Sequence, residues 1–398
     1  MVSWRNDILR LMREAAVPGI AVALIRDGRL DRYVNLGVRG VQKPVALDQD
    51  TVFDAASLSK PVFAHLVLQL VDRGELALEA SLDDYVPGYL AADPRARSVT
   101  VGHVLSHCSG LPNWRNADYP LRTYFAPGER FSYSGEGYLY LQRAVEAIMG
   151  EKLPALAQRL VFEPLAMDRS SFVWQPYFDD NRAWPHDAFG APALGNKPGE
   201  ANTAWSLQTT AADFARFLIA VLDGVGLKPE TARLWLRPRI DIRHRGIQWL
   251  EPLTEDVVTD VAWGLGWGLE SRAGTFFHWG DNGPFTSFTI GSMRHRSAFV
   301  AFTNSASGHS IMSALVAKVV PGDRPSLSWL DYGRHDGPVR RLFRAAMADG
   351  VEASWSEMQR AALGPGDLRW IAQGLNARGR EKDSQWLRRQ IETPQKPT

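Results

Sequence analysis

Hydrophobic positions near the start of the chain fall at two different spacings. Residues 3–16 place apolar side chains on one side of a helix, with charged residues opposite. The short apolar runs 20–25 and 30–37 flank Asp27-Gly28, a strong turn signal, and together they predict a β-hairpin. Residues 62–71 are apolar nearly all round, which predicts a buried helix. The chain is therefore expected to open as helix, hairpin and helix.

Helical spacing dominates the middle of the chain, where long Pro- and Gly-rich stretches separate the helices. Residues 174–204 are rich in Pro, Gly, Asn and Asp and show no clear period. A connection of that length inside a compact domain is usually functional or disordered. Helices are expected at 100–105, 138–149 and 214–222.

Strand-like runs return near the end, at 274–280, 285–290 and 298–303, and a helix is expected at 310–319. Strands at both ends with helices between them predict an α/β (α+β) protein. Its antiparallel sheet would be built from both termini, be flanked by helices and carry an inserted, mostly helical domain. The expected division is a sheet domain of residues 1–75 and 264–330, a helical insertion 76–263 and a C-terminal helical tail 331–398, with a helical hairpin at 367–391.

Composition narrows the class of protein. The chain has 398 residues, of which 45% are hydrophobic and 22% charged, and its net charge is +1. These values are typical of a soluble globular protein and give no reason to expect nucleic acid or a membrane as a partner. Cys108 is the single cysteine, so no intrachain disulfide can form. With no signal-like N-terminus and no apolar run of about 18 residues, a cytoplasmic location is expected. A periplasmic or secreted location would follow if a signal peptide had been removed, and the oligomeric state stays open.

A serine and a lysine stand three residues apart where the buried helix begins. Side chains at i and i+3 share one helix face, so Ser57 and Lys60 can meet as a hydroxyl and the amine that takes its proton. Pro61 is tolerated only in the first turn, which places Ser57 at or near the helix N-terminus, where the helix dipole favours a developing oxyanion. A capping serine and a lysine with a buried stem would give the same short pattern.

Two later motifs strengthen the catalytic interpretation of Ser57 and Lys60. Ser57-Leu58-Ser59-Lys60, Tyr133-Ser134-Gly135 and His278-Trp279-Gly280 resemble, in order and approximate spacing, the three motifs of the serine β-lactamase and penicillin-binding-protein superfamily. The chain is most similar to class C β-lactamase-like serine hydrolases and family VIII esterases over roughly residues 5–330. Other stretches that agree are 18–22, 105–112, 125–128 and 163–167.

The resemblance implies a role for each motif residue. Ser57 would be the acylated nucleophile, and Lys60 with Tyr133 would form the proton-transfer pair. His278 would belong to the catalytic set through the third motif. The backbone N–H groups of Ser57 and Asp281 would form the oxyanion hole.

Two departures from the family pattern bear on the substrate. The second motif usually ends in asparagine, whereas Gly135 offers only space; the third is often Lys-Thr-Gly, whereas His278-Trp279 stands here. Both changes weaken a site for an anionic lactam, so we expect a small ester or amide substrate that is neutral and fairly apolar. Gly135, Trp279, Gly280 and Phe285 are expected to contact it, and Trp114, Trp174, Trp184 and Trp205 are further candidates for an apolar wall.

Other functions stay open. A β-lactamase, a D-amino-acid-specific peptidase or amidase, or an acyltransferase would use the same site, and a non-catalytic ligand-binding descendant would keep the fold alone. An α/β-hydrolase is excluded, since Gly-x-Ser-x-Gly is absent. The pair His103 and His107 is the nearest approach to zinc spacing, but His65 and His107 are interpreted as structural. No cofactor or metal is expected.

Overall fold

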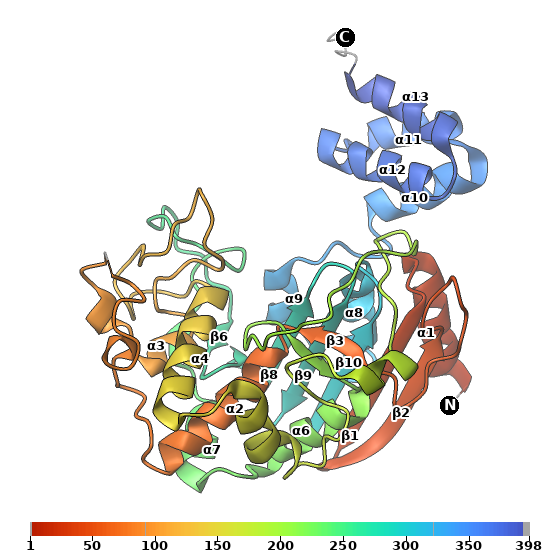
Figure 1. The fold of residues 1–398 in the computed structure, drawn as a ribbon. Coiled ribbons are helices and arrows are strands. Elements are labelled where there is room, and N and C mark those ends of the chain that lie inside the picture. The colour runs from red at the N-terminus through yellow and green to blue at the C-terminus, as the bar shows by residue number, and fades with distance from the viewer. Residues whose placement is uncertain (1, 92, 321, 393–398) are drawn as a thin grey trace.

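An antiparallel sheet built from both ends of the chain organises the computed structural model (Figure 1), which describes residues 2–91, 93–320 and 322–392. The eight strands run in the order β2-β1-β10-β9-β8-β7-β6-β5, and each neighbouring pair is antiparallel. Their bounds are β1 Gly19–Arg26, β2 Arg29–Gly37, β5 Ile240–Asp241, β6 Ala262–Trp263, β7 Gly268–Glu270, β8 Thr275–Asp281, β9 Thr286–Ser292 and β10 Ser297–Thr303. The expected fold class is confirmed.

Helices cover both faces of this sheet, and strand β1 shows why. Its side chains alternate between the faces, so a strand buried on both sides reads as a continuous apolar run. Ala21 and Ala23 pack with helices α2 (Ser59–Asp72) and α6 (Ala211–Asp223) on one face. Ile20 and Val22 pack on the other face with α1 (Val2–Ala15), α8 (Met312–Val316) and α9 (Pro325–Leu330).

A second, short sheet carries the serine motif. Strand β3 (Phe53–Ala56) pairs with β4 (Leu207–Thr209) and runs into α2. The remaining elements are η1 Leu82–Asp84, η2 Ala96–Ser98, α3 Val101–Leu105, α4 Gly135–Met149, α5 Leu153–Ala157, η3 Gln158–Phe162, η4 Pro176–Asp180, α7 Pro229–Trp235 and η5 Gly308–Ile311. The short strands β5 and β6 join the large sheet although they lie within the segment expected to be helical, and the division into domains stays a prediction.

The last helices form a small bundle that stands apart from the sheet (Figure 1). They are α10 Pro338–Asp349, α11 Val351–Arg360, α12 Pro365–Ala377 and α13 Glu381–Glu392, so the expected helical hairpin is confirmed in α12 and α13. The bundle has a core of its own, which includes Leu342, Ile371 and Leu387. Phe189, from the long connection 174–204, enters this core and packs against Phe343 and Trp370 at ring-centroid distances of 5.4 and 4.7 Å.

No helix in the described part of the chain is both long enough and apolar enough to cross a membrane.

Candidate active site

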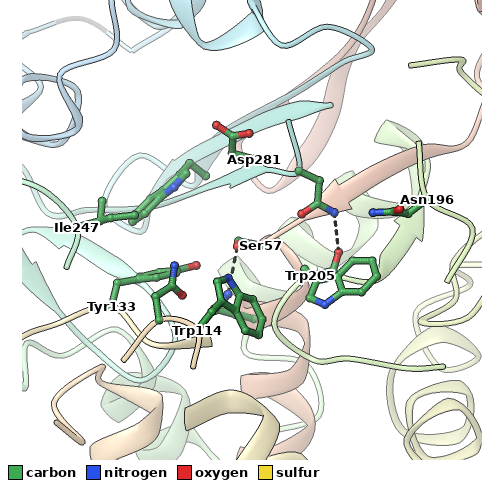
Figure 2. A pocket seen from close by; sticks show the side chains of 11 residues that line it. Ser57, Trp114, Tyr133, Asn196, Trp205, Ile247 and Asp281 are labelled. Atoms are coloured by element: carbon green, nitrogen blue, oxygen red, sulfur yellow. Dashed lines mark hydrogen bonds between the residues drawn. The ribbon is translucent and has the colours of Figure 1, made fainter. Parts of the chain in front are cut away.

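A cavity of about 310 Å³ brings together residues of all three sequence motifs (Figure 2), of which the third contributes only its middle residue, Trp279. Its walls come from the start of α2, the segments before α4, the long connection, and the end of β8. The residues that line it are Ser57, Lys60, Asn113, Trp114, Tyr133, Asn196, Trp205, Ile247, Trp279, Asp281 and Asn282.

Ser57 lies on the turn between β3 and α2, and a strained backbone presents it to the cavity. Ala56 has φ of +50°, a left-handed conformation that costs a residue with a Cβ about 1 kcal/mol or more. The N–H of Ala56 donates to Asp54 Oδ1 at 2.9 Å, which holds this conformation. The Oγ of Ser287, on β9, donates to the Ala55 carbonyl at 3.0 Å, so the large sheet also fixes the turn.

Lys60 reaches Ser57 from the first turn of α2. Its Nζ lies 3.1 Å from Ser57 Oγ and 2.7 Å from the carbonyl oxygen of Ala204. The side chain is buried, with 1% of its surface exposed, and burial holds the pKa of Lys60 well below its usual value. A neutral amine can donate one N–H to Ala204 and turn its lone pair toward the serine hydroxyl. The geometry therefore fits a general base.

The Tyr133 ring lies against the amine of Lys60. Its ring centroid lies 4.6 Å from Lys60 Nζ, and its N–H donates to the carbonyl of Ile247 at 2.9 Å. The hydroxyl makes no well-formed hydrogen bond with any described residue. The nearby Ser57 side chain lowers the pKa of Tyr133, whereas burial raises it. Burial dominates and raises the pKa of Tyr133. The phenol is thus protonated at neutral pH and able to donate.

His107 holds the tyrosine segment in place. Its backbone carbonyl accepts from Ser132 N–H at 2.8 Å, and its Nδ1 accepts from Ser134 N–H at 3.1 Å. The imidazole also packs against the Tyr133 ring, with centroids 4.2 Å apart. His107 therefore fixes the backbone on both sides of Tyr133, a structural role in line with the sequence interpretation.

Four residues expected at the site are not among those that line the cavity: His278, Gly280, Phe285 and Gly135. His278 is fully buried behind Tyr133, with ring centroids 6.2 Å apart, and burial lowers its pKa to about 3. Gly280 faces the Ala55 carbonyl and Ser287, where the backbones of β3 and β8 approach too closely for a Cβ. Phe285 is a member of the hydrophobic core. Strand alternation explains the first two, because His278 and Gly280 point to the face opposite Trp279.

The space expected beside Gly135 is filled. A Cβ at this position would lie 2.7 Å from the ring of Trp114 and 3.0 Å from the carbonyl oxygen of Asn113. Trp114 itself is 40% exposed and forms part of the cavity wall. The glycine therefore admits an aromatic wall rather than enlarging the cavity.

The long connection and the residue that follows it supply another part of the cavity wall. Asn196 and Trp205 line the cavity, whereas Trp174 and Trp184 lie away from it and pack against Arg182. Sequence reasoning missed the lining residues Asn113, Asn196, Ile247 and Asn282. Each comes from a segment without regular period, so the sequence carried no signal for its position.

A buried carboxylate ties the two proposed oxyanion-hole segments together. Asn282 Nδ2 donates to both oxygens of Asp54, at 2.8 and 2.9 Å, and to the carbonyl of Trp205 at 3.2 Å. Burial is the largest effect on Asp54 and raises its pKa to about 6, against the hydrogen bonds from Asn282 and Ala56. Asp54 thus links the turn before Ser57 to the residue after Asp281.

No group of three or more His, Cys, Asp or Glu side chains within the described ranges is arranged to hold a metal ion. His103 and His107 face different partners, since His103 Nδ1 accepts from Thr100 N–H while His107 bonds Ser134.

The sheet, the start of α2 and the Ser57–Lys60–Tyr133 cluster define the class of serine hydrolases that share the β-lactamase and penicillin-binding-protein fold. A family model described as Beta-lactamase matches residues 4–319. The chain therefore belongs to the beta-lactamase family.

Individual relatives carry different names. Penicillin-binding protein 4 of Amycolatopsis lactamdurans is 31% identical over 288 residues, which cover 67% of this chain and 74% of that protein. Esterase EstB of Burkholderia gladioli is 32% identical over 196 residues, which cover 41% of this chain and 49% of the relative.

Solved structures agree on the fold. The octameric penicillin-binding protein homologue from Pyrococcus abyssi superposes with a TM-score of 0.68 at 21% identity, covering 86% of this chain and 81% of the other. A class C beta-lactamase superposes with a TM-score of 0.65 at 18% identity, covering 81% of this chain and 96% of the other.

Proposed function

We propose that this protein is a serine hydrolase that forms an acyl-enzyme at Ser57 on a small ester or amide, with carboxylesterase-like activity. The observation that carries the proposal is the approach of Lys60 Nζ to Ser57 Oγ at 3.1 Å, inside a buried site that lowers the lysine pKa. A lysine with a purely structural role would not be expected to lie beside a serine hydroxyl that lines a cavity.

Acylation in the proposed reaction uses three proton transfers. Neutral Lys60 takes the proton of Ser57 as Oγ attacks the substrate carbonyl, and the backbone N–H groups of Ser57 and Asp281 stabilise the oxyanion. Protonated Tyr133 then gives its proton to the leaving group, and the proton on Lys60 restores the phenol. Water enters and attacks the acyl-enzyme, with the same groups working in reverse to release the acid. His278 supports Tyr133 from behind and exchanges no proton in this scheme.

The cavity wall supports a neutral, fairly apolar substrate and weak or absent β-lactamase activity. Three tryptophans, Trp114, Trp205 and Trp279, are among the eleven residues of the wall. The charged side chain at the cavity other than Lys60 is Asp281, among the residues that line it, and a carboxylate repels an anionic substrate.

Turnover of p-nitrophenyl butyrate and nitrocefin, measured side by side for the native protein and Ser57→Ala, tests the proposal. We expect the native protein to favour the ester and the variant to lose about 10³-fold or more in kcat, since the nucleophile is gone. Thermal unfolding of both proteins controls for folding, and a serine-reactive phosphonate should label only the native chain.

The other outcomes are equally informative. Faster turnover of nitrocefin than of the ester would make the protein a β-lactamase. If neither substrate turns over and Ser57 resists the phosphonate, a non-catalytic ligand-binding role replaces the proposed one.

A further inference from the structure

Asn113 borders the cavity with a carboxamide of which only the oxygen is hydrogen-bonded within the described residues. Its Oδ1 accepts the N–H of Gly135 at 2.9 Å. A backbone N–H can only donate, so the oxygen must face Gly135 and the NH₂ group must face the other way. The amide orientation, which is often ambiguous in asparagine, is therefore fixed by this bond.

The Nδ2 of Asn113 is left as an available donor. It has no hydrogen-bond partner in residues 2–91, 93–320 and 322–392, and it is not sealed from solvent. Asn282, another carboxamide of the cavity wall, differs in this respect because its Nδ2 is already bound to Asp54 and Trp205. A substrate atom can therefore bind to Asn113 without breaking an existing contact.

The backbone of Asn113 is held as firmly as that of Tyr133. Its N–H donates to Gln248 Oε1 at 2.8 Å, and its carbonyl accepts the N–H of Glu136 at 2.9 Å. Ile247, beside Gln248, accepts the N–H of Tyr133. One short segment thus supports both the proposed proton donor and the amide, and a donor held in this way loses little entropy when it binds.

We propose that Asn113 is a specificity-determining residue whose Nδ2 donates a hydrogen bond to an oxygen that the substrate carries beside the scissile carbonyl. The inference rests on the proposed function and narrows its substrate class to esters or amides that bear a second acceptor, such as an amide or ether oxygen. A site built to donate to such an oxygen selects against an analogue that lacks it, because the donor is then left without a partner in a partly desolvated wall.

Asn113→Asp is the sharpest variant, because its carboxylate still accepts from Gly135 N–H but has no donor and repels an acceptor oxygen. Two pairs of esters separate the acyl side from the alcohol side. The acyl pair is the p-nitrophenyl esters of N-acetylglycine and of pentanoic acid. The alcohol pair is the butyrate esters of 2-methoxyethanol and of butanol, followed by acid release.

The measured quantity is the ratio of kcat/KM within each pair. For the native protein we expect the acceptor-bearing ester to be preferred in at least one pair, and for Asn113→Asp we expect that preference to fall about tenfold. Asn116→Asp is the matched control: Asn116 lies on the same segment, is exposed, and its Oδ1 also accepts backbone N–H groups, from Asp118 and Tyr119. This control should leave both ratios unchanged.

Phosphonate labelling separates this inference from the proposed function. If Ser57 is labelled in native and Asn113→Asp proteins but neither ratio differs between them, the inference is wrong while the acyl-enzyme stands. If the native protein is not labelled and turns over no ester, both fail. Asn113→Leu, which removes both ends of the amide, should lose the same preference, and an unchanged preference in it would also overturn the inference.

Discussion

Asp54 is a buried carboxyl group that also fixes the backbone conformation just before Ser57. It accepts the N–H of strained Ala56 and the amide of Asn282, yet it is buried, with 5% of its surface exposed. An ionised carboxylate in that position gains two sets of hydrogen bonds and loses its hydration. The rise of its pKa shows that the loss of hydration is the larger effect.

This balance predicts a pH dependence of stability. The pKa of Asp54 is about 6 in the folded protein against the ordinary aspartate value of 3.8, so the folded state binds its proton more tightly than the unfolded state does. The cost of ionising Asp54 is absent below pH 3.8 and complete above about pH 6, so stability falls by about 3 kcal/mol as pH rises through this window.

Denaturant unfolding at pH 4 and pH 6.5 measures the effect. Asp54→Asn should lack this part of the pH dependence. Asp336→Asn should keep it, because Arg334 lowers the pKa of Asp336 to about 2 and that residue stays ionised across the window. Equal pH dependence in native protein and Asp54→Asn would contradict the prediction.

At the scale of single residues, the sequence indicated the groups whose chemistry depends on residue type. Ser57, Lys60 and Tyr133 stand in motifs and meet at the cavity. Asn113 and Asn282 could not be found in this way. An asparagine is common on irregular segments, and its use depends on which backbone N–H or carboxylate the fold places next to it.

At the scale of elements, strand β8 decides which motif residues can face the cavity. Successive side chains of a strand point to opposite faces, so Trp279 borders the cavity while His278 and Gly280 share the other face, where Gly280 meets β3. The sequence identified the motif, and it also predicted that successive side chains of the strand alternate between two faces. It could not predict which face meets the cavity, because that depends on how β3 packs against the sheet.

The two motif glycines should respond differently to alanine. At Gly280 an added Cβ would overlap the Ala55 carbonyl and Ser287 Oγ, so Gly280→Ala must move backbone and should cost about 3 kcal/mol or more in unfolding free energy. At Gly135 the Cβ meets the exposed ring of Trp114, which can turn away, and lies 3.0 Å from the Asn113 carbonyl oxygen, which has to shift by only a few tenths of an ångström. Gly135→Ala should therefore cost less than about 1 kcal/mol but change KM for the butyrate ester.

Urea unfolding and ester kinetics on the two variants check this contrast. Similar losses of stability at both positions would mean that Trp114 is held as rigidly as the backbone of β3.

At the scale of the molecule, the sequence predicted the sheet from both termini and the helices of the tail because apolar period and turn residues are local signals. It did not predict where the tail docks. Phe189 lies in a stretch with no period, yet it is 6% exposed and fills the space beside Gly374 in the tail core. Arg344, which donates to the carbonyl of Glu14 at 3.0 Å, adds a second contact with the main body.

Phe189→Ala should weaken the docking of the tail. Loss of a buried phenylalanine costs about 3–5 kcal/mol, and here the loss falls on the contact between tail and connection. Calorimetry should show the tail unfolding at lower temperature, ahead of the main body. Phe178→Ala, which removes a fully buried ring from the same connection outside the tail core, should instead lower the main transition. A single, equally shifted transition in both variants would contradict this account.

The connection that carries Phe189 also carries Asn196, so one continuous segment has one contact in the tail core and another at the cavity. Thermodynamic linkage makes such an arrangement reciprocal. Any factor by which a bound substrate strengthens the docking of the tail is the factor by which a docked tail strengthens substrate binding. Where that factor differs from one, removing the helices of the tail changes the affinity of the cavity by the same factor.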